Sequence, residues 1–156
     1  MCIRDSAKDA LRRQLEFLRT IHPFALAWAR LFYIYGDGQS SNSLYSQLQA
    51  AVMRGDAVFN MSGGEQLRDY LPVHKVAHFI VELALRCYDN TIVNVCAGQP
   101  ISVRRLVERW IQQNNWKIAP NFDYYPYPDY ESMAFWGDSS KLETFFTVSS
   151  REGTGR

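Results

Sequence analysis

An arginine beside two glycines is the residue of this chain whose surroundings most suggest ligand binding. The segment GGEQLRDYLPVHKVA covers residues 63–77 and places Arg68 in a short piece between a predicted strand and a predicted helix. An arginine there can direct parallel N–H donors onto the oxygens of a phosphate group. A surface ion pair of Arg68 with Asp69 or Glu65 is the alternative. The residues alone leave both interpretations open.

A glycine-containing turn, GDGQSS at residues 36–41, stands where a dinucleotide-binding loop would stand. It follows the apolar run FALAWARLFYIY and precedes a helical pattern. Two features do not fit that motif: Ser41 occupies the position of the third glycine, and the next strand, AVFNM, ends without the acidic residue that binds a ribose. We therefore predict a turn at the carboxyl end of a buried strand, where open α/β sheets bind their ligands.

Hydrophobic spacing predicts the elements that position these residues. Apolar residues recur at helical intervals in residues 7–20, 43–55, 73–89 and 103–115, and a last short helix capped by Asp138 or Ser139 is predicted. Short apolar runs predict strands at 24–34, 57–61 and 91–96. We expect residues 24–34 to be the most buried strand of a parallel arrangement, because their apolar run is unbroken. Helices alternating with strands indicate a layered α/β fold.

Three of the predicted helices have a defined inner face, and the segment that follows them is a loop. The predicted inward residues are Leu44, Leu48, Ala51 and Val52, then Val76, Ile80, Leu83, Ala84 and Cys87, and then Val103, Leu106, Val107 and Trp110. Residues 116–136 are rich in tyrosine and proline. This loop is interpreted as a lid over a bound base and sugar, with a plain surface loop or a partner-binding segment as alternatives.

Charge and cysteine content limit the classes of function. The net charge of +1 offers no electrostatic basis for binding nucleic acid or an anionic membrane surface. No apolar run approaches the roughly 18 to 20 residues of a membrane span. Cys2, Cys87 and Cys96 form no C-x-x-C motif and have no nearby histidine pair, so we expect buried thiols, no metal site and a cytoplasmic location.

The first six residues, MCIRDS, are excluded from the fold prediction. Their back-translation resembles the transposase adaptor of sequencing libraries, so we expect residues 1–6 to be an adaptor scar. The domain prediction then has two further parts, residues 7–150 as one carboxyl-terminal half-domain and residues 151–156 as a tail.

Four segments resemble the extended short-chain dehydrogenase/reductases, the NAD-dependent epimerase/dehydratase family of nucleotide sugars. They are RLFYIYGDGQ, GGEQLRDYLPVHKVA, VNVCAGQPISVRRLV and FWGDSSKL, in the order and rough spacing of that family. The loop YYPYPDYESMAFWGD is most similar to the deoxysugar 4-ketoreductases. The segment VHKVA departs from the family, because His74 and Lys75 stand where it usually has an acidic pair before the helix. That loss removes a favourable carboxylate from the helix start.

The resemblance implies the carboxyl-terminal part of a Rossmann-like extended fold, comprising the last sheet strands and a small substrate-binding α/β subdomain. The glycine-rich cofactor loop of the family would lie upstream. Lys8 stands where the family has the lysine of its Tyr-x-x-x-Lys pair, so the catalytic tyrosine is expected at position 4, now Arg4. In the family this lysine holds the cofactor ribose and lowers the pKa of the tyrosine. A solvated charge on a first helical turn is the alternative for Lys8.

The resemblance also assigns ligand contacts. Lys8 and Phe32 are expected to contact the cofactor, NAD or NADP in the intact parent. Tyr33, Arg68 and Glu131 are expected to bind the nucleotide-linked sugar: Arg68 on the diphosphate and Glu131 on ribose hydroxyls, with an exposed glutamate as the alternative. Tyr33 occupies a position that is often asparagine in the sugar epimerases, which argues against a plain UDP-galactose epimerase. We also expect Arg68, Tyr33 and the turn at Gly36 and Gly38 to line one cleft.

The predicted function is a fragment of an NAD(P)-dependent nucleotide-sugar oxidoreductase that transfers hydride at the sugar C4. The fragment is expected to be inactive alone, and the parent to form a homodimer without nucleic acid or membrane partners. Two alternatives stay open, an epimerase or dehydratase of the same superfamily, and a non-catalytic nucleotide-binding relative.

Overall fold

The computed structural model of the chain describes residues 3–86 and 90–152. In chain order its elements are α1 (Ile3–Ile21), β1 (Ala27–Leu31), β2 (Tyr33–Tyr35), α2 (Leu44–Arg54), β3 (Val58–Asn60), β4 (Leu67–Arg68), β5 (Tyr70–Pro72), α3 (Val73–Arg86), β6 (Thr91–Val95), β7 (Ile101–Ser102), α4 (Val103–Gln113), β8 (Ala119–Asn121), β9 (Ala134–Phe135) and α5 (Ser140–Glu152).

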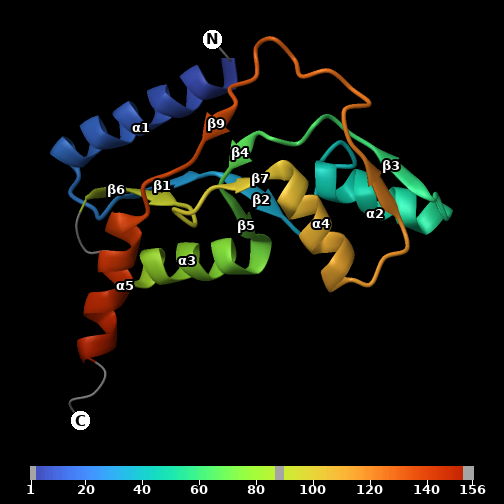
Figure 1. Cartoon of the computed structure of the whole chain (residues 1–156). Coiled ribbons are helices and arrows are strands. Elements are labelled where there is room, and N and C mark those ends of the chain that lie inside the picture. Colours follow the sequence, from blue (N-terminus) through green and yellow to red (C-terminus); the bar gives the residue numbers. More distant parts are fainter. Residues whose placement is uncertain (1–2, 87–89, 153–156) are drawn as a thin grey trace.

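Short strands run through the middle of the molecule with helices on both sides (Figure 1). Parallel pairs form between β1 and β6, between β2 and β5, and between β3 and β8. The strand β4 pairs antiparallel with β7 and parallel with β9. In Figure 1, α1 lies above this strand layer, while α3 and α5 lie below it. This is the layered α/β arrangement with parallel pairing that the sequence predicts.

Two helices begin and end where their capping residues predict. Ser43 precedes α2 and its Oγ accepts from the Ser46 N–H, and Ser102 precedes α4 and accepts from the Arg105 N–H. Such caps satisfy donors that the first helical turn leaves unpaired. Gly55 ends α2 in the left-handed conformation, with φ of 79°, which glycine adopts without a Cβ penalty.

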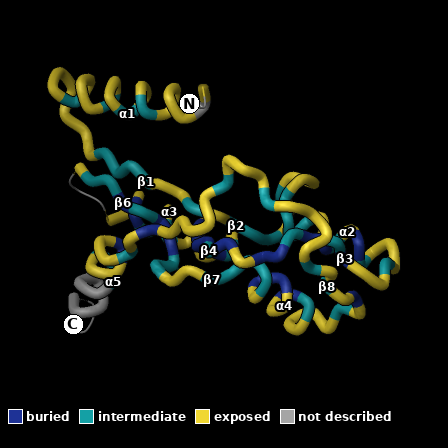
Figure 2. The backbone as a smooth tube through the Cα atoms, turned by 45° about the horizontal axis from the view of Figure 1, so that its top comes forward, coloured by how far each residue is buried: buried dark blue, intermediate teal, exposed yellow. Residues whose placement is uncertain are grey.

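Two apolar cores lie side by side along the molecule. The α2–α4 core contains Leu48, Ala51, Phe59, Met61, Leu106, Val107, Trp110 and Ile118. The β6–α3 core contains Leu71, Val76, Leu83, Val93, Val95 and Leu142. The predicted inner faces of α2 and α4 are confirmed, because their inward residues either belong to the first core or pack against it. Figure 2 shows the buried positions concentrated in the strand layer and along α4.

The run at residues 24–34 is a strand region, but it is not the most buried one. It divides into β1 and β2 on either side of Phe32, and none of its residues is fully buried. The buried strand is β6, where Val93 and Val95 are each 1% exposed. The reason is that, among the described strands, β1 has a neighbour on one side only. In the described part of the chain it pairs with β6 alone, so Leu31 at its end remains 47% exposed.

Three further predictions differ from the structure. The inner face of α3 is formed by Val76, Phe79 and Leu83, whereas Ile80 and Ala84 are exposed. The first helix starts at Ile3 instead of residue 7, inside the predicted scar. The last helix, predicted to be short, continues to Glu152.

The predicted burial of Cys96 is confirmed. Cys2 and Cys87 lie outside the described residues. None of the helices in the described ranges is both long enough and apolar enough to cross a membrane.

Candidate functional site

The side chain of Arg68 is buried and held from three directions. It is 3% exposed, and its Nη2 donates to Glu131 Oε1 at 2.7 Å and to the Ser132 carbonyl at 2.6 Å. Its Nη1 donates to the Leu67 carbonyl at 2.9 Å. The surface pairing with Asp69 or Glu65 is therefore wrong, and the ion-pair partner is Glu131. A guanidinium carries more N–H donors than these three bonds use, so donors remain for a ligand.

A hollow of about 550 Å³ opens beside this ion pair. Its lining consists of Tyr33, Arg68, Tyr130, Glu131, Ser132 and Phe135. The Arg68 guanidinium carbon lies 5.8 Å from the centre of the Tyr33 ring, within the range of a cation–π contact. The structure thus brings together the three residues predicted to bind the substrate, from β2, β4 and the loop before β9.

The turn at Gly36 does not line this hollow, contrary to the predicted common cleft. Gly36 instead packs against the start of α3, where a Cβ built on it would lie 2.7 Å from Val73 Cγ1. Its φ of +140° is also one that other residues rarely adopt. The turn therefore serves to bring β2 close to α3.

Asp69, next to Arg68 in the chain, accepts hydrogen bonds from the backbone of two other segments. Its carboxylate is completely buried and accepts from the N–H groups of Ala97 at 2.7 Å, Gly98 at 2.9 Å and Gly137 at 3.4 Å. These donors belong to the loop after β6 and to the segment after β9. One carboxylate thus ties three distant segments together around the hollow.

An aromatic wall continues from the hollow toward β1. Phe32 stacks on Phe135 with ring centres 5.3 Å apart and planes 24° apart. Gly137 lets this pair approach, because a Cβ there would lie 2.7 Å from Phe32 Cζ. Phe32, predicted to contact the cofactor, therefore lies directly behind a wall of the substrate hollow.

Lys8 lies on α1 and lines a different hollow, of about 760 Å³, between that helix and β1. Asp5, Asp9 and the strand residues 28–31 share this lining. The Lys8 side chain is exposed and forms no hydrogen bond or ion pair with the described residues. The structure therefore does not bring Lys8 into the hollow of Arg68.

Two other groups near the site have raised pKa values. The pKa of Tyr70 is raised to about 12, mainly by burial and to a lesser extent by the neighbouring Tyr33. The charge of Arg68 lowers it by a smaller amount. Burial and the Asp69 carboxylate raise the pKa of Cys96 to about 11. Both groups therefore stay protonated at neutral pH, and Cys96 has little thiolate character.

The tyrosine-rich loop is anchored at its base. The Tyr127 hydroxyl accepts from the Glu65 N–H at 3.1 Å, and the N–H groups of Tyr124 and Tyr125 donate to the Met61 carbonyl. Tyr130, at the mouth of the hollow, is 91% exposed. A lid role for this loop stays a prediction.

Sequence reasoning missed two contributors to the site. Gln66 is buried and its Nε2 donates to Glu131 Oε2 at 3.4 Å, while its Oε1 has no partner. Phe135 forms a wall of the hollow. The signal for Gln66 was its place two residues before Arg68, because side chains two apart in an extended segment face the same way. Phe135 opens the quoted segment FWGDSSKL, but that segment gave no reason to place its ring in the site.

Comparison with known proteins supports the fold. The chain matches no protein-family profile. It is 33% identical over 132 residues to dTDP-6-deoxy-L-talose 4-dehydrogenase (NAD(+)) of Aggregatibacter actinomycetemcomitans, over 84% of this chain and 48% of that protein. It is 26% identical over 115 residues to GDP-6-deoxy-D-talose 4-dehydrogenase of the same organism, over 72% of this chain and 38% of that protein. The chain thus spans half or less of the length of these relatives.

A solved structure gives the same result at the level of fold. UDP-N-acetylglucosamine 4-epimerase from Methanobrevibacter ruminantium M1, in complex with UDP-N-acetylmuramic acid, superposes with a TM-score of 0.75 at 21% identity, over 90% of this chain and 46% of that one. The chain therefore belongs with the extended short-chain dehydrogenase/reductases, as the carboxyl-terminal part of that fold. Within them its sequence relatives are the two 6-deoxytalose 4-dehydrogenases.

Proposed function

We propose that this chain is the substrate-binding part of an NAD(P)-dependent nucleotide-sugar oxidoreductase that transfers hydride at the sugar C4. The observation that carries the proposal is the buried Arg68, paired with Glu131 at 2.7 Å on the edge of a hollow with aromatic walls. A buried cation with donors left over suits the diphosphate of a nucleotide sugar. The names of the two sequence relatives support the same class of substrate.

The residues of the hollow divide the binding task by charge. Arg68 donates to the diphosphate oxygens, where its planar guanidinium can contact two oxygens at once. Glu131 is partly exposed and retains acceptor capacity beside the Arg68 bond, so it accepts from ribose hydroxyls. Gln66 holds the second carboxylate oxygen and keeps Glu131 in place. Tyr33 and Phe135 offer apolar faces to the sugar.

Lys8 suits one part of a nicotinamide cofactor, its ribose. Lys8 has an uncommitted ammonium group on the rim of the hollow beside β1, and we propose that it holds the cofactor ribose in the complete protein. The cofactor, NAD or NADP, would supply or accept the hydride. A tyrosine at position 4 would supply the proton, with its pKa lowered by the charge of Lys8.

Binding of nucleoside diphosphates tests the substrate assignment. Titration of the 156-residue chain with dTDP, UDP and GDP is expected to show saturable binding of at least one. The variant Arg68→Gln is expected to weaken it about 10- to 100-fold, because a hydrogen bond to a charged group contributes about 1.5–3 kcal/mol. Arg54→Gln is the control, since Arg54 is exposed and, among the described residues, forms its ion pair with Asp56 alone. Equal binding by wild type and Arg68→Gln would contradict the assignment.

Turnover tests the reaction and separates it from the two alternatives. We propose that the chain alone does not oxidise NADH or NADPH with nucleotide-linked 4-keto-deoxysugars, whereas a protein rebuilt with the cofactor domain of a relative and Arg4→Tyr does. In the rebuilt protein, Lys8→Ala is expected to slow turnover by about 10²- to 10⁴-fold. Epimerisation or dehydration products would favour the first alternative. Nucleotide binding without any turnover would favour a non-catalytic relative.

A further inference from the structure

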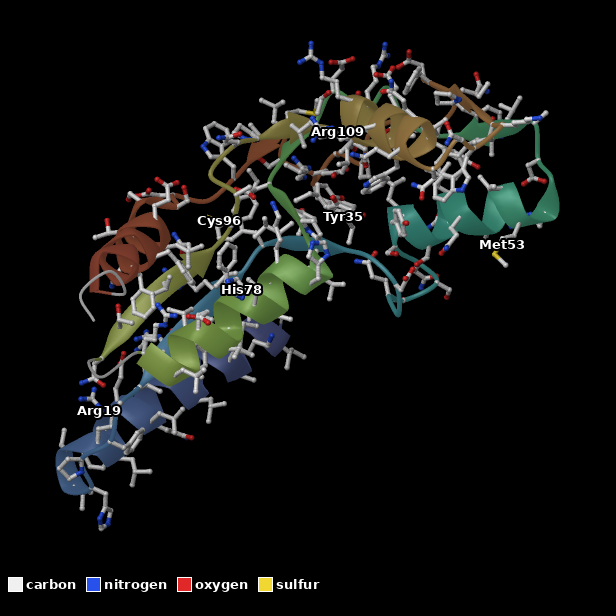
Figure 3. The ribbon with its side chains drawn as sticks, turned by 90° about the horizontal axis from the view of Figure 1, so that it is seen from below. Arg19, Tyr35, Met53, His78, Cys96 and Arg109 are labelled. Atoms are coloured by element: carbon white, nitrogen blue, oxygen red, sulfur yellow. The ribbon has the colours of Figure 1, made fainter. Side chains whose placement is uncertain are left out.

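A second hollow, unrelated to the proposed substrate site, lies where α3, α4 and the end of β2 meet. Its volume is about 700 Å³, and it shares no lining residue with the hollow of Arg68. Figure 3 views the molecule from below and shows Arg109 on α4 and Tyr35 at the end of β2, both of which line this second hollow. We call it the α3–α4 pocket.

The charge on its walls is strongly one-sided. Lys75 of α3 and Arg105 and Arg109 of α4 line the pocket, and none of the three forms an ion pair or side-chain hydrogen bond with the described residues. Glu65 is the acidic residue of the lining, and its carboxylate is already paired with Arg104 at 3.3 Å. A hollow lined by uncompensated charge of one sign concentrates counter-ions. These walls therefore attract anions.

Neutral donors stand beside the cations. Tyr35 and Tyr70 line the pocket, and neither hydroxyl has a hydrogen-bond partner in the described structure. The hydroxyl of Tyr70 keeps its proton at neutral pH, because burial raises its pKa to about 12. One lysine, two arginines and two tyrosine hydroxyls together offer more N–H and O–H donors than a single carboxylate can accept. The pocket therefore suits an anion with more oxygens than a carboxylate has.

The sequence around α3 points the same way. Pro72 immediately precedes α3 and has no side-chain oxygen to accept from the first N–H groups of the helix. His74 and Lys75 lie in the first turn of α3, and neither α3 nor α4 has an acidic residue in its first turn. The first turns of these two helices thus supply no carboxylate to offset the charge of Lys75, which lines the pocket.

We propose that the α3–α4 pocket binds a diphosphate group, separately from the nucleotide sugar, through Lys75, Arg105 and Arg109 with Tyr35 and Tyr70 as additional donors. The three cations match the charge of a diphosphate, and the forked guanidinium groups match its oxygens. Pyrophosphate is the simplest probe of this chemistry, because it carries no base or sugar that the substrate hollow could recognise.

Calorimetric titration of the full chain with pyrophosphate is expected to show one site that is tighter than that for orthophosphate and that weakens as salt rises. The location is checked by amide chemical shifts, which are expected to move around Lys75 and Arg105. Shifts confined to residues 131–135 would place the anion on Arg68 and overturn the proposal, as would the absence of binding.

Matched variants complete the test. Arg105→Ala/Arg109→Ala is expected to weaken pyrophosphate binding at least about tenfold. Lys117→Ala/Lys141→Ala removes the same charge from exposed positions outside the pocket and is expected to change it less than about twofold. Circular dichroism checks that both variants keep the fold, and Lys75→Gln gives a milder replacement if the double variant does not. Equal losses in the two double variants would mean general charge attraction and would overturn the site.

Discussion

The two apolar cores of this chain differ in how completely they are covered. The α2–α4 core is closed by its own helices and by the rings of Tyr35, Tyr45 and Tyr70, which pack around Trp110 at centroid distances of 5.0–6.1 Å. The β6–α3 core has buried centres at Val93 and Val95, yet apolar side chains remain exposed around it.

The exposed side chains of the second region lie on β1, α3 and α1. Leu31 ends β1, Val81 and Leu85 lie on α3, and Phe17 on α1 is 68% exposed. Because hydrophobic stabilisation follows the apolar area removed from water, the same kind of residue contributes unequally in the two regions. Stability is therefore expected to be concentrated around Trp110, with α1 opening at lower cost.

Truncating one aromatic residue in each region gives the largest expected contrast. Trp110 is 1% exposed, so Trp110→Ala should lower the free energy of unfolding by about 3–5 kcal/mol. Phe17→Ala should lower it by less than about 0.5 kcal/mol, as expected for a surface substitution. Urea titration of both variants measures the difference. Similar losses would show that α1 is packed more closely in solution than in this structure.

Asp69 connects β4 with the loop after β6 and with the segment after β9, and its removal is expected to have the next largest effect. Asp69→Ala leaves the N–H groups of Ala97, Gly98 and Gly137 without their acceptor, which should cost about 3 kcal/mol in the free energy of unfolding. Asp56→Ala, at the exposed end of α2, is the control and should cost little. A loss below about 1 kcal/mol for Asp69→Ala would show that these donors find water instead.

Alkaline pH is expected to produce the smallest effect and to report mainly on the α2–α4 core, against which Tyr70 packs. The native pKa of Tyr70, about 12, lies above the ordinary value of 10.0, so the unfolded chain loses the proton first. The contribution of Tyr70 is therefore full below pH 10 and is lost progressively between about pH 10 and 12, by about 2 kcal/mol. Unfolding measured across this range should show a flatter pH dependence for Tyr70→Phe.

Cys96 is expected to contribute to the same alkaline pH dependence of unfolding, next to the β6–α3 core. Its pKa is raised from 9.0 to about 11, so its contribution should decline from about pH 9 upward, in the same direction. Tyr70→Phe leaves this part of the pH dependence in place. An unchanged slope above pH 10 in Tyr70→Phe would mean that this tyrosine does not carry the alkaline loss.

Local sequence signals determined the helices α2 and α4, their caps and their inner faces. Ser43, Gly55 and Ser102 act on neighbouring backbone groups, and Leu48 and Trp110 face inward because of the helical period. The resemblance in its short motifs also pointed to Arg68, Tyr33 and Glu131 before any contact between them was known. Burial of β1 could not be predicted in this way, because an apolar run does not state how many strands lie beside it.

Only the tertiary structure decided which groups are partners. Arg68 and Glu131 are 63 residues apart in the chain, and the Asp69 carboxylate reaches donors 28 to 68 residues away. Such pairs depend on the pairing of β4 with β7 and β9, which no local period encodes. Lys8 and Arg68 likewise line different hollows, and three cations of α3 and α4 line a third one. Residue type and spacing thus determine the secondary structure of each segment and the chemistry of its side chains. Long-range strand pairing determines which side chains become neighbours, because the position of a side chain follows from the position of its backbone.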